Sequence, residues 1–162
     1  MRYQYSKLLF LLALVFSVIF SCQKEPSFQE RYFSESNVVA IKSYLDTLGF
    51  KEDELKRKVI LFSPSLSCPP FFSETQYWQD NLYLYPDIDF SLVILTKYEM
   101  SARALVKSEG IKIPYKQDST DILQVEKLLP ELPVKIYFDK DGILAKISSM
   151  NGNVEEFSNL IK

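Results

Sequence analysis

Hydrophobic residues along this chain form runs of two kinds, which predict an alternation of strands and helices. Val59–Phe62 and Ile88–Leu95 are short apolar runs that contain β-branched residues, as in strands covered on both faces. Other segments carry apolar residues three and four positions apart, which is the spacing of one helix face. The predicted helices cover residues 36–48, 68–85, 96–109, 121–129 and 153–161.

The pattern near the C-terminus predicts a β-hairpin. Val134–Phe138 alternates apolar residues with Lys135 and Tyr137, and Ile143–Ile147 follows as a return strand. Asp141-Gly142 between them is a hairpin turn sequence. Because a βαβ unit makes parallel neighbours and a hairpin adds antiparallel strands, we expect an α/β fold with a mixed central sheet and helices on both faces.

Three local expectations complete the predicted elements. Thr96-Lys97-Tyr98-Glu99 has the residues of a capping box at the start of a helix. Ile111–Tyr115 is expected to be a short extended piece in which Pro114 limits pairing. The mixed charge run Lys51–Lys58 is expected to be a solvated connection.

The first 21 residues predict a secretion signal. Arg2 and Lys7 form a basic start without an acidic residue, and Leu8–Phe20 follows as an apolar run that only Ser17 interrupts. This run is too short to span a bilayer comfortably. A plain signal peptide and an uncleaved anchor are the alternatives to a cleaved lipoprotein signal.

The end of that run, Ile19-Phe20-Ser21-Cys22, resembles the bacterial lipobox. The resemblance implies cleavage before Cys22 and lipid attachment through its sulfur, which would anchor the protein on a membrane. We therefore expect a signal peptide over 1–21, a tether over 22–35 and one domain over 36–162. The expected location is the bacterial cell envelope, at the outer membrane facing the periplasm, with the cell surface as the alternative.

Composition and charge narrow the classes of function. The chain is 25% charged and 47% hydrophobic, which fits one ordinary globular domain. Its formal net charge of −2 gives no basic surface for nucleic acid. It has no histidine, so an imidazole base and a His-ligated metal are excluded. The pairs Asp87 and Asp89, and Asp139 and Asp141, occur in turn sequences, where Asp is favoured for local hydrogen bonds. We expect no metal and no cofactor.

One cysteine stands between the first predicted buried strand and the next helix, in Ser67-Cys68-Pro69-Pro70-Phe71. A second landmark is Leu132-Pro133, which leads into the predicted hairpin. Together with the element order, these segments resemble the thioredoxin fold, and most closely its membrane-tethered TlpA-like branch. The resemblance covers roughly residues 55–162.

The resemblance implies a role for each of these residues. Cys68 falls on the nucleophilic cysteine of the family, and Pro69 and Pro70 fall on residues beside it that contact substrate. Leu132 would pair through its backbone with a bound peptide, and Pro133 would be cis and face the cysteine.

The same resemblance locates two departures from the family pattern. Ser67 replaces the family's tryptophan, and Phe71 replaces its second, resolving cysteine. A helix start would lower the pKa of the Cys68 thiol only modestly, because no Lys or Arg occurs between Ser63 and Tyr77.

Two functions remain open at this point. A single thiol at Cys68 can isomerise disulfides, trap a substrate or be resolved by an external thiol, with envelope thiol proteins or peptides as partners. Alternatively, Cys68 is inert and the domain is a redox-inactive binding or adaptor module. A peroxidatic cysteine is disfavoured, because no Thr stands between Pro64 and Cys68.

Overall fold

The computed structural model describes residues 27–64, 69–120, 122–150 and 154–161. The chain divides into two compact units, residues 1–31 and 32–162. The described part of the first unit holds the start of helix α2 (Phe28–Tyr32), where Glu30 N donates to Ser27 Oγ and Ser27 N donates to Glu30 Oε2. All other described elements belong to the second unit. No helix in the described ranges is long and apolar enough to cross a membrane.

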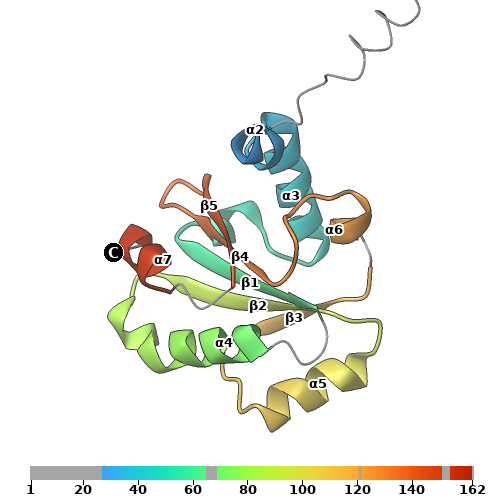
Figure 1. Ribbon diagram of the computed structural model, residues 1–162, viewed down its shortest axis with the longest axis vertical. Helices are drawn as coiled ribbons and strands as arrows, with labels where there is room; N and C mark the ends of the chain where they lie inside the picture. Colours follow the sequence, from blue (N-terminus) through green and yellow to red (C-terminus); the bar gives the residue numbers. More distant parts are fainter. Residues whose placement is uncertain (1–26, 65–68, 121, 151–153, 162) are drawn as a thin grey trace, which may run out of the picture. The chain divides into compact units, whose positions relative to one another are not determined.

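The second unit is built on a five-stranded mixed sheet with the strand order β3-β2-β1-β4-β5 (Figure 1). The first three strands are parallel to one another, whereas β4 runs antiparallel to both β1 and β5. The bounds are β1 (Lys58–Pro64), β2 (Asp89–Leu95), β3 (Tyr115–Asp118), β4 (Val134–Phe138) and β5 (Leu144–Ser149). The expected mixed sheet and late hairpin are confirmed.

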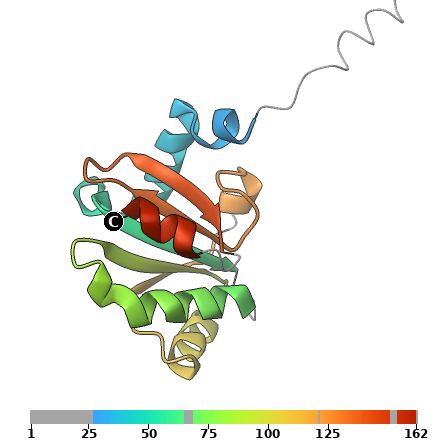
Figure 2. The ribbon, with the colours of Figure 1, turned by 60° about the vertical axis from the view of Figure 1, so that its left-hand side comes forward.

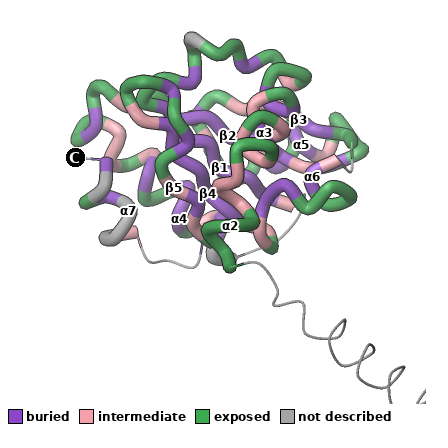
Figure 3. Tube along the Cα trace, turned by 90° about the horizontal axis from the view of Figure 1, so that it is seen from above, coloured by how far each residue is buried: buried purple, intermediate pink, exposed green. Residues whose placement is uncertain are grey.

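Helices cover both faces of this sheet, so that the central strands are buried on both sides (Figure 3). One face packs against α3 (Glu35–Thr47) and α6 (Ile122–Val125). The other packs against α4 (Pro69–Asn81), α5 (Glu99–Ser108) and α7 (Val154–Ile161); Figure 2 shows α4 and α7 on that face. Two 3-10 turns, η1 (Glu52–Leu55) and η2 (Leu82–Leu84), precede β1 and follow α4.

The helix periodicity predicts the buried faces correctly where apolar residues recur over three turns. Ile41 and Leu45 of α3 are fully buried, as are Phe71 and Trp78 of α4. Among the residues expected on the inner face of the last helix, Ile161 is buried and Val154 is partly buried.

Helix α6 is shorter than the predicted helix over 121–129. Lys127 has a left-handed backbone with φ 51, and Leu128 N donates to Leu123 O, which closes the helix end. Leu128 and Leu129 are nevertheless buried, because the irregular segment after α6 also packs on the core. The prediction of a helix was therefore right for Ile122–Val125 and wrong for the residues that follow.

The structure corrects the predicted capping box, the bounds of the extended piece at 111–115 and the solvation of the charge run, whereas the limit that Pro114 sets on pairing is confirmed. Thr96 Oγ1 accepts from Tyr98 N rather than from Glu99 N, so the capping box does not form. Strand β3 begins only after Pro114, whose carbonyl accepts from Leu92 N while its ring nitrogen has no proton to donate. The charge run before β1 is not simply solvated, because Leu55 and Lys58 are buried.

Candidate functional site

Two of the predicted site residues, Cys22 and Cys68, lie outside the described residues, so their roles stay predictions. Pro69 and Pro70 are the first two residues of α4, which tolerates proline there because the N–H groups of the first turn lack helical partners. Cys68 therefore directly precedes the first residue of this helix in the chain.

The peptide bond between Leu132 and Pro133 is cis, as the resemblance implied. The antiparallel register pairs Phe62 of β1 with Val134 of β4. Leu132 and Pro133 are consequently level with the end of β1, which is the end from which the chain continues toward α4. Both residues are partly exposed, and Pro133 O accepts from Met150 N. The fold thus brings the end of β1 and the cis bond to one edge of the sheet, although Pro64 and Leu132 lie more than sixty residues apart in sequence.

Phe71, at the position of the family's second cysteine, is a core residue. It is 1% exposed and belongs to the apolar cluster between the sheet and α4. Its ring meets that of Phe72 edge-on, with 5.2 Å between the centroids. Phe71 supplies packing and no polar group, so it cannot replace a resolving thiol.

Beneath α4 lies a buried ion pair that the sequence pattern did not predict. Lys135 Nζ donates to Glu74 Oε1, and both side chains are 0% exposed. Trp78 Nε1 donates to the same carboxylate oxygen at 3.2 Å. The alternation in β4 predicts a Lys135 side chain on a polar face, but α4 covers that face. The sequence holds only two signals of this ion pair. They are Lys135, a charged residue within a predicted strand, and Glu74, which stands one turn after Phe71.

Two buried side-chain oxygens near this pair have no hydrogen-bond partner among the described residues. They are Glu74 Oε2 and Thr75 Oγ1. Buried polar groups of this kind are uncommon in folded proteins, because each costs the free energy of its lost hydration. The first half of α4 is therefore polar on its buried side.

A groove runs along the same sheet edge as the cis bond. Register places Asp118, Leu95 and Pro64 in one row across β3, β2 and β1, and Leu132 continues this row beside β1. Two cavities follow the row, with volumes of about 180 and 490 Å³. They share Pro64, Leu123 and Gln124, so they form one continuous groove, which we call the edge groove.

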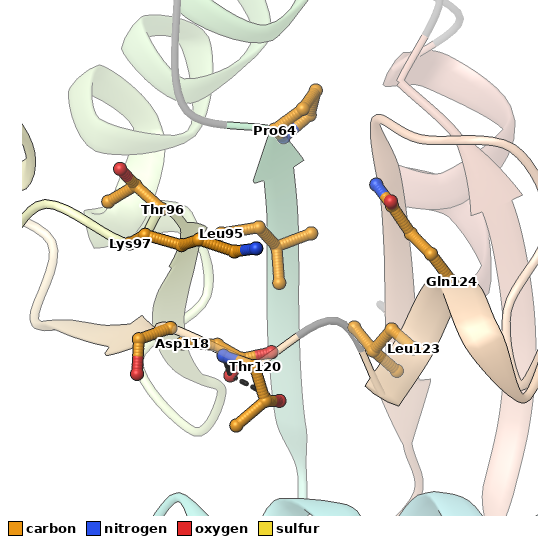
Figure 4. Close-up of a pocket in the computed structure, with 9 residues that line it drawn as sticks. Pro64, Leu95, Thr96, Lys97, Asp118, Thr120, Leu123 and Gln124 are labelled. Carbon is orange, nitrogen blue, oxygen red and sulfur yellow. Dashed lines mark hydrogen bonds between the residues drawn. The ribbon is translucent and has the colours of Figure 1, made fainter.

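Figure 4 shows the smaller end of the edge groove. The ends of β2 and β3 form one wall, Leu123 and Gln124 of α6 form the other, and Pro64 lies at the end of β1 between them. The Lys97 side chain extends from the β2 wall toward α6. The larger end is lined by residues that follow α6 and lead into the cis bond, among them Lys127, Leu129 and Leu132.

Asp118 is the buried acid of the edge groove, and local donors satisfy it. Its Oδ2 accepts from Tyr44 OH at 2.7 Å, and its Oδ1 accepts from Thr120 N and Thr120 Oγ1, each at 2.7 Å. Burial, followed by the hydrogen bond and charge of Asp118, raises the pKa of Tyr44 far above its usual range. Asp118 thus fixes β3 to α3 and is not a free base.

The described residues contain no group of three His, Cys, Asp or Glu side chains that could hold a metal ion. Asp87 and Asp89, which could be considered as ligands of a metal, form ion pairs instead. Their partners are Arg57 and Lys58, at the opposite end of β1. Asp139 accepts from Asp141 N and Ile143 N within the hairpin turn. The local hydrogen bonds that the turn sequences predict are thus confirmed at Asp139, whereas Asp87 and Asp89 pair with basic residues 30 and 31 positions earlier in the chain.

The comparisons with known proteins concern the fold. The crystal structure of StoA from Bacillus subtilis superposes with a TM-score of 0.54 at 18% identity, over 65% of this chain and 81% of StoA. A secreted disulfide oxidoreductase from Mycobacterium tuberculosis, described as homologous to DsbE of E. coli, gives 0.52 at 15% identity, over 66% and 82%. The thioredoxin domain of a thiol-disulfide oxidoreductase from Bacteroides vulgatus gives 0.52 at 16% identity, over 65% and 81%.

The fold is thioredoxin-like. The predicted fold class is thus confirmed by strand order, helix placement and these superpositions. No family model and no curated protein matches the sequence. The thioredoxin-like domain carries the cis Leu132-Pro133 bond, the start of α4 and the edge groove at one end of its sheet.

Proposed function

We propose that this thioredoxin-like domain performs thiol–disulfide exchange through one cysteine, Cys68. The observation that supports the proposal is that the cis Leu132-Pro133 bond and the edge groove lie together at the sheet edge where β1 ends. Cys68 directly precedes α4 in the chain, the cis Leu132-Pro133 bond is level with the end of β1, and the edge groove begins beside that bond. A thiol at a helix start favours its thiolate form, because unpaired N–H groups and the helix dipole stabilise negative charge.

The reaction requires an external thiol to complete a cycle. The Cys68 thiolate attacks one sulfur of a client disulfide, a mixed disulfide forms, and the other client sulfur leaves as a thiolate. Because Phe71 offers no sulfur, a second thiol must come from the client or from another protein. Its attack on the mixed disulfide releases Cys68 as thiolate, so the complete exchange leaves Cys68 unchanged. Residues of the proposed client site are Pro69, Pro70, Leu132 and Pro133.

The proposal extends to the TlpA-like branch and to the cell envelope. The basic start, the apolar run and Cys22 support a lipoprotein signal over 1–21, with anchoring through the Cys22 sulfur. One of the similar structures is described as a secreted protein. A lipid-anchored domain facing the periplasm would meet proteins in an oxidising compartment, where disulfides form.

A second candidate is a redox-inactive binding module. The burial of Phe71 favours it, because the position of a resolving cysteine is filled by a core aromatic ring. This module would use the edge groove for binding and would leave Cys68 without a role.

Trapping of mixed disulfides distinguishes the two candidates. Cells producing the wild-type protein are quenched with acid and alkylated, and the protein is examined on non-reducing gels. Exchange predicts covalent adducts that dithiothreitol releases and that a Cys68→Ser variant lacks. Absence of adducts, with Cys68 recovered as a free thiol, would favour the binding module.

The anchor is tested separately. Metabolic labelling with a radioactive fatty acid should label the wild-type protein, and a Cys22→Ala variant should remain unlabelled and unprocessed. Equal labelling of the two proteins would exclude Cys22 as the attachment site.

A further inference from the structure

Aliphatic side chains line both cavities of the edge groove. Its two cavities are lined by side chains that offer methyl groups or a proline ring and are at least partly buried: Pro64, Leu95, Leu123, Leu129, Pro130 and Leu132. Val125 of α6, close in sequence to two of them, is 75% exposed. A groove with aliphatic lining residues along a sheet edge suits an extended chain with aliphatic side chains.

The charged side chains that line the edge groove differ in burial and in the partners that they already have. Asp118 is buried and receives three hydrogen bonds, so among the described lining residues Glu131 is the exposed carboxylate. Lys127 is exposed at the larger cavity, whereas Lys97, exposed at the smaller cavity, already takes part in another interaction. In the described part of the chain, no acceptor lies within hydrogen-bond distance of Lys127 Nζ. The exposed ammonium group of Lys127, beside aliphatic side chains, can pair with a carboxylate of a ligand.

Lys127 is held at the groove by an uncommon backbone conformation. Its φ of 51 lies in the left-handed region, which glycine adopts without steric cost and lysine does not. Lys127 is the second residue after α6, a position at which glycine commonly ends a helix. A lysine thus lines the cavity from a position that would suit glycine, and this motivates the hypothesis that its side chain has a role there.

We propose that the edge groove binds an extended client segment with aliphatic residues and a carboxylate beside them, and that Lys127 pairs with this carboxylate. This inference rests on the proposed function, since it defines the class of client that would reach Cys68. Lys127 is thus a specificity residue that takes no part in thiol chemistry. Its contribution is electrostatic, so high salt should weaken it.

The test uses two fluorescent ten-residue peptides without cysteine. Each has a Leu-Val-rich centre, and one ends in two glutamates whereas the other ends in two lysines. Binding to the full-length protein in a non-ionic detergent is followed by anisotropy. We expect the acidic peptide to bind about tenfold more tightly, and Lys127→Glu to abolish this preference. Equal affinities, or no binding of either peptide, would overturn the proposal.

Two further variants separate charge from folding. Lys127→Gly should also lose the preference while its melting temperature rises, because glycine relieves the left-handed backbone. Lys140→Glu makes the same charge change in the exposed β4–β5 turn, and it should keep the preference within about twofold. Loss of preference in Lys140→Glu would show a nonspecific charge effect and would also overturn the proposal.

The outcome is independent of the proposed exchange reaction. Because the peptides lack sulfur, Cys68→Ser should bind them as the wild type does. If Cys68 proves inert and the preference for the acidic peptide persists, the proposal of thiol–disulfide exchange is rejected and the edge-groove proposal is supported. If Cys68 reacts and the peptides are not discriminated, the edge-groove proposal fails alone.

Discussion

Lys135 and Glu74 form an ion pair with no exposed surface, and this pair joins β4 to α4. The two elements are the ones that follow the cis Leu132-Pro133 bond and Cys68 in the chain. The pair therefore connects the two halves of the proposed client site below its surface. A buried pair is costly to break, because the remaining partner keeps an uncompensated charge.

Removing one partner of this pair should destabilise the domain severely. Lys135→Met and Glu74→Gln are each expected to lower the free energy of unfolding by about 3–5 kcal/mol. The double variant Glu74→Met with Lys135→Met should recover most of this loss, since no buried charge remains. Urea unfolding can be followed through Trp78, the single tryptophan, which contacts Glu74. A double variant less stable than either single one would contradict this account.

Thr75 and Thr120 predict opposite results for the same substitution. Thr75 Oγ1 is buried without a hydrogen-bond partner in the part of the chain that the structure describes, so Thr75→Val should stabilise the domain by about 1 kcal/mol. Thr120 Oγ1 donates to Asp118, so Thr120→Val should destabilise it by about 1.5–3 kcal/mol. Thermal unfolding of both variants checks the signs, and a destabilised Thr75→Val protein would show a partner for that hydroxyl.

The Tyr44–Asp118 hydrogen bond predicts a loss of stability in alkali. The folded state raises the pKa of Tyr44, so above the ordinary tyrosine pKa of about 10 only the unfolded chain releases this proton. The contribution of Tyr44 to stability is complete below that pH and falls by about 1.4 kcal/mol per pH unit above it. Tyr44→Phe should therefore cost about 2 kcal/mol at pH 8 and clearly less at pH 11. A constant difference between the two proteins at both pH values would contradict the raised pKa.

Phe71→Cys tests the alignment of α4 with the thioredoxin-like site. Residues 68 and 71 are three apart where the helix begins, a spacing that brings two cysteines within bridging distance. The variant should form an internal disulfide with Cys68 in mild oxidant, as shown by loss of both thiols in the monomer. In its reduced form it should be less stable by about 3 kcal/mol, because a buried ring is lost. Two persistent free thiols under oxidation would place residue 68 away from the start of α4.

The fold was predictable because its strongest signals are local. Val59–Phe62 is apolar at every position and is indeed buried on both faces, and Gly142 has the positive φ that its hairpin turn requires. The cis Leu132-Pro133 bond followed from the family resemblance and is confirmed.

The edge groove and the buried pair were not predictable, because they depend on contacts between distant segments. The register of β1 and β4 places Lys135 opposite Leu61, on the face of the sheet that α4 covers. The residue pattern within β4 does not show that a helix packs on this face. Lys127 appeared only as part of a predicted helix, so its left-handed backbone and its place in the groove could not be foreseen.

Alkylation of Cys68 against pH tests the central claim most directly. In the full-length Cys22→Ser protein, Cys68 is the only thiol, and its rate with iodoacetamide can be followed by mass spectrometry. The account predicts reaction in the folded state with a midpoint below the ordinary thiol pKa of about 8.5. Negligible alkylation until the protein is unfolded would contradict it, because a buried thiol cannot attack a client disulfide.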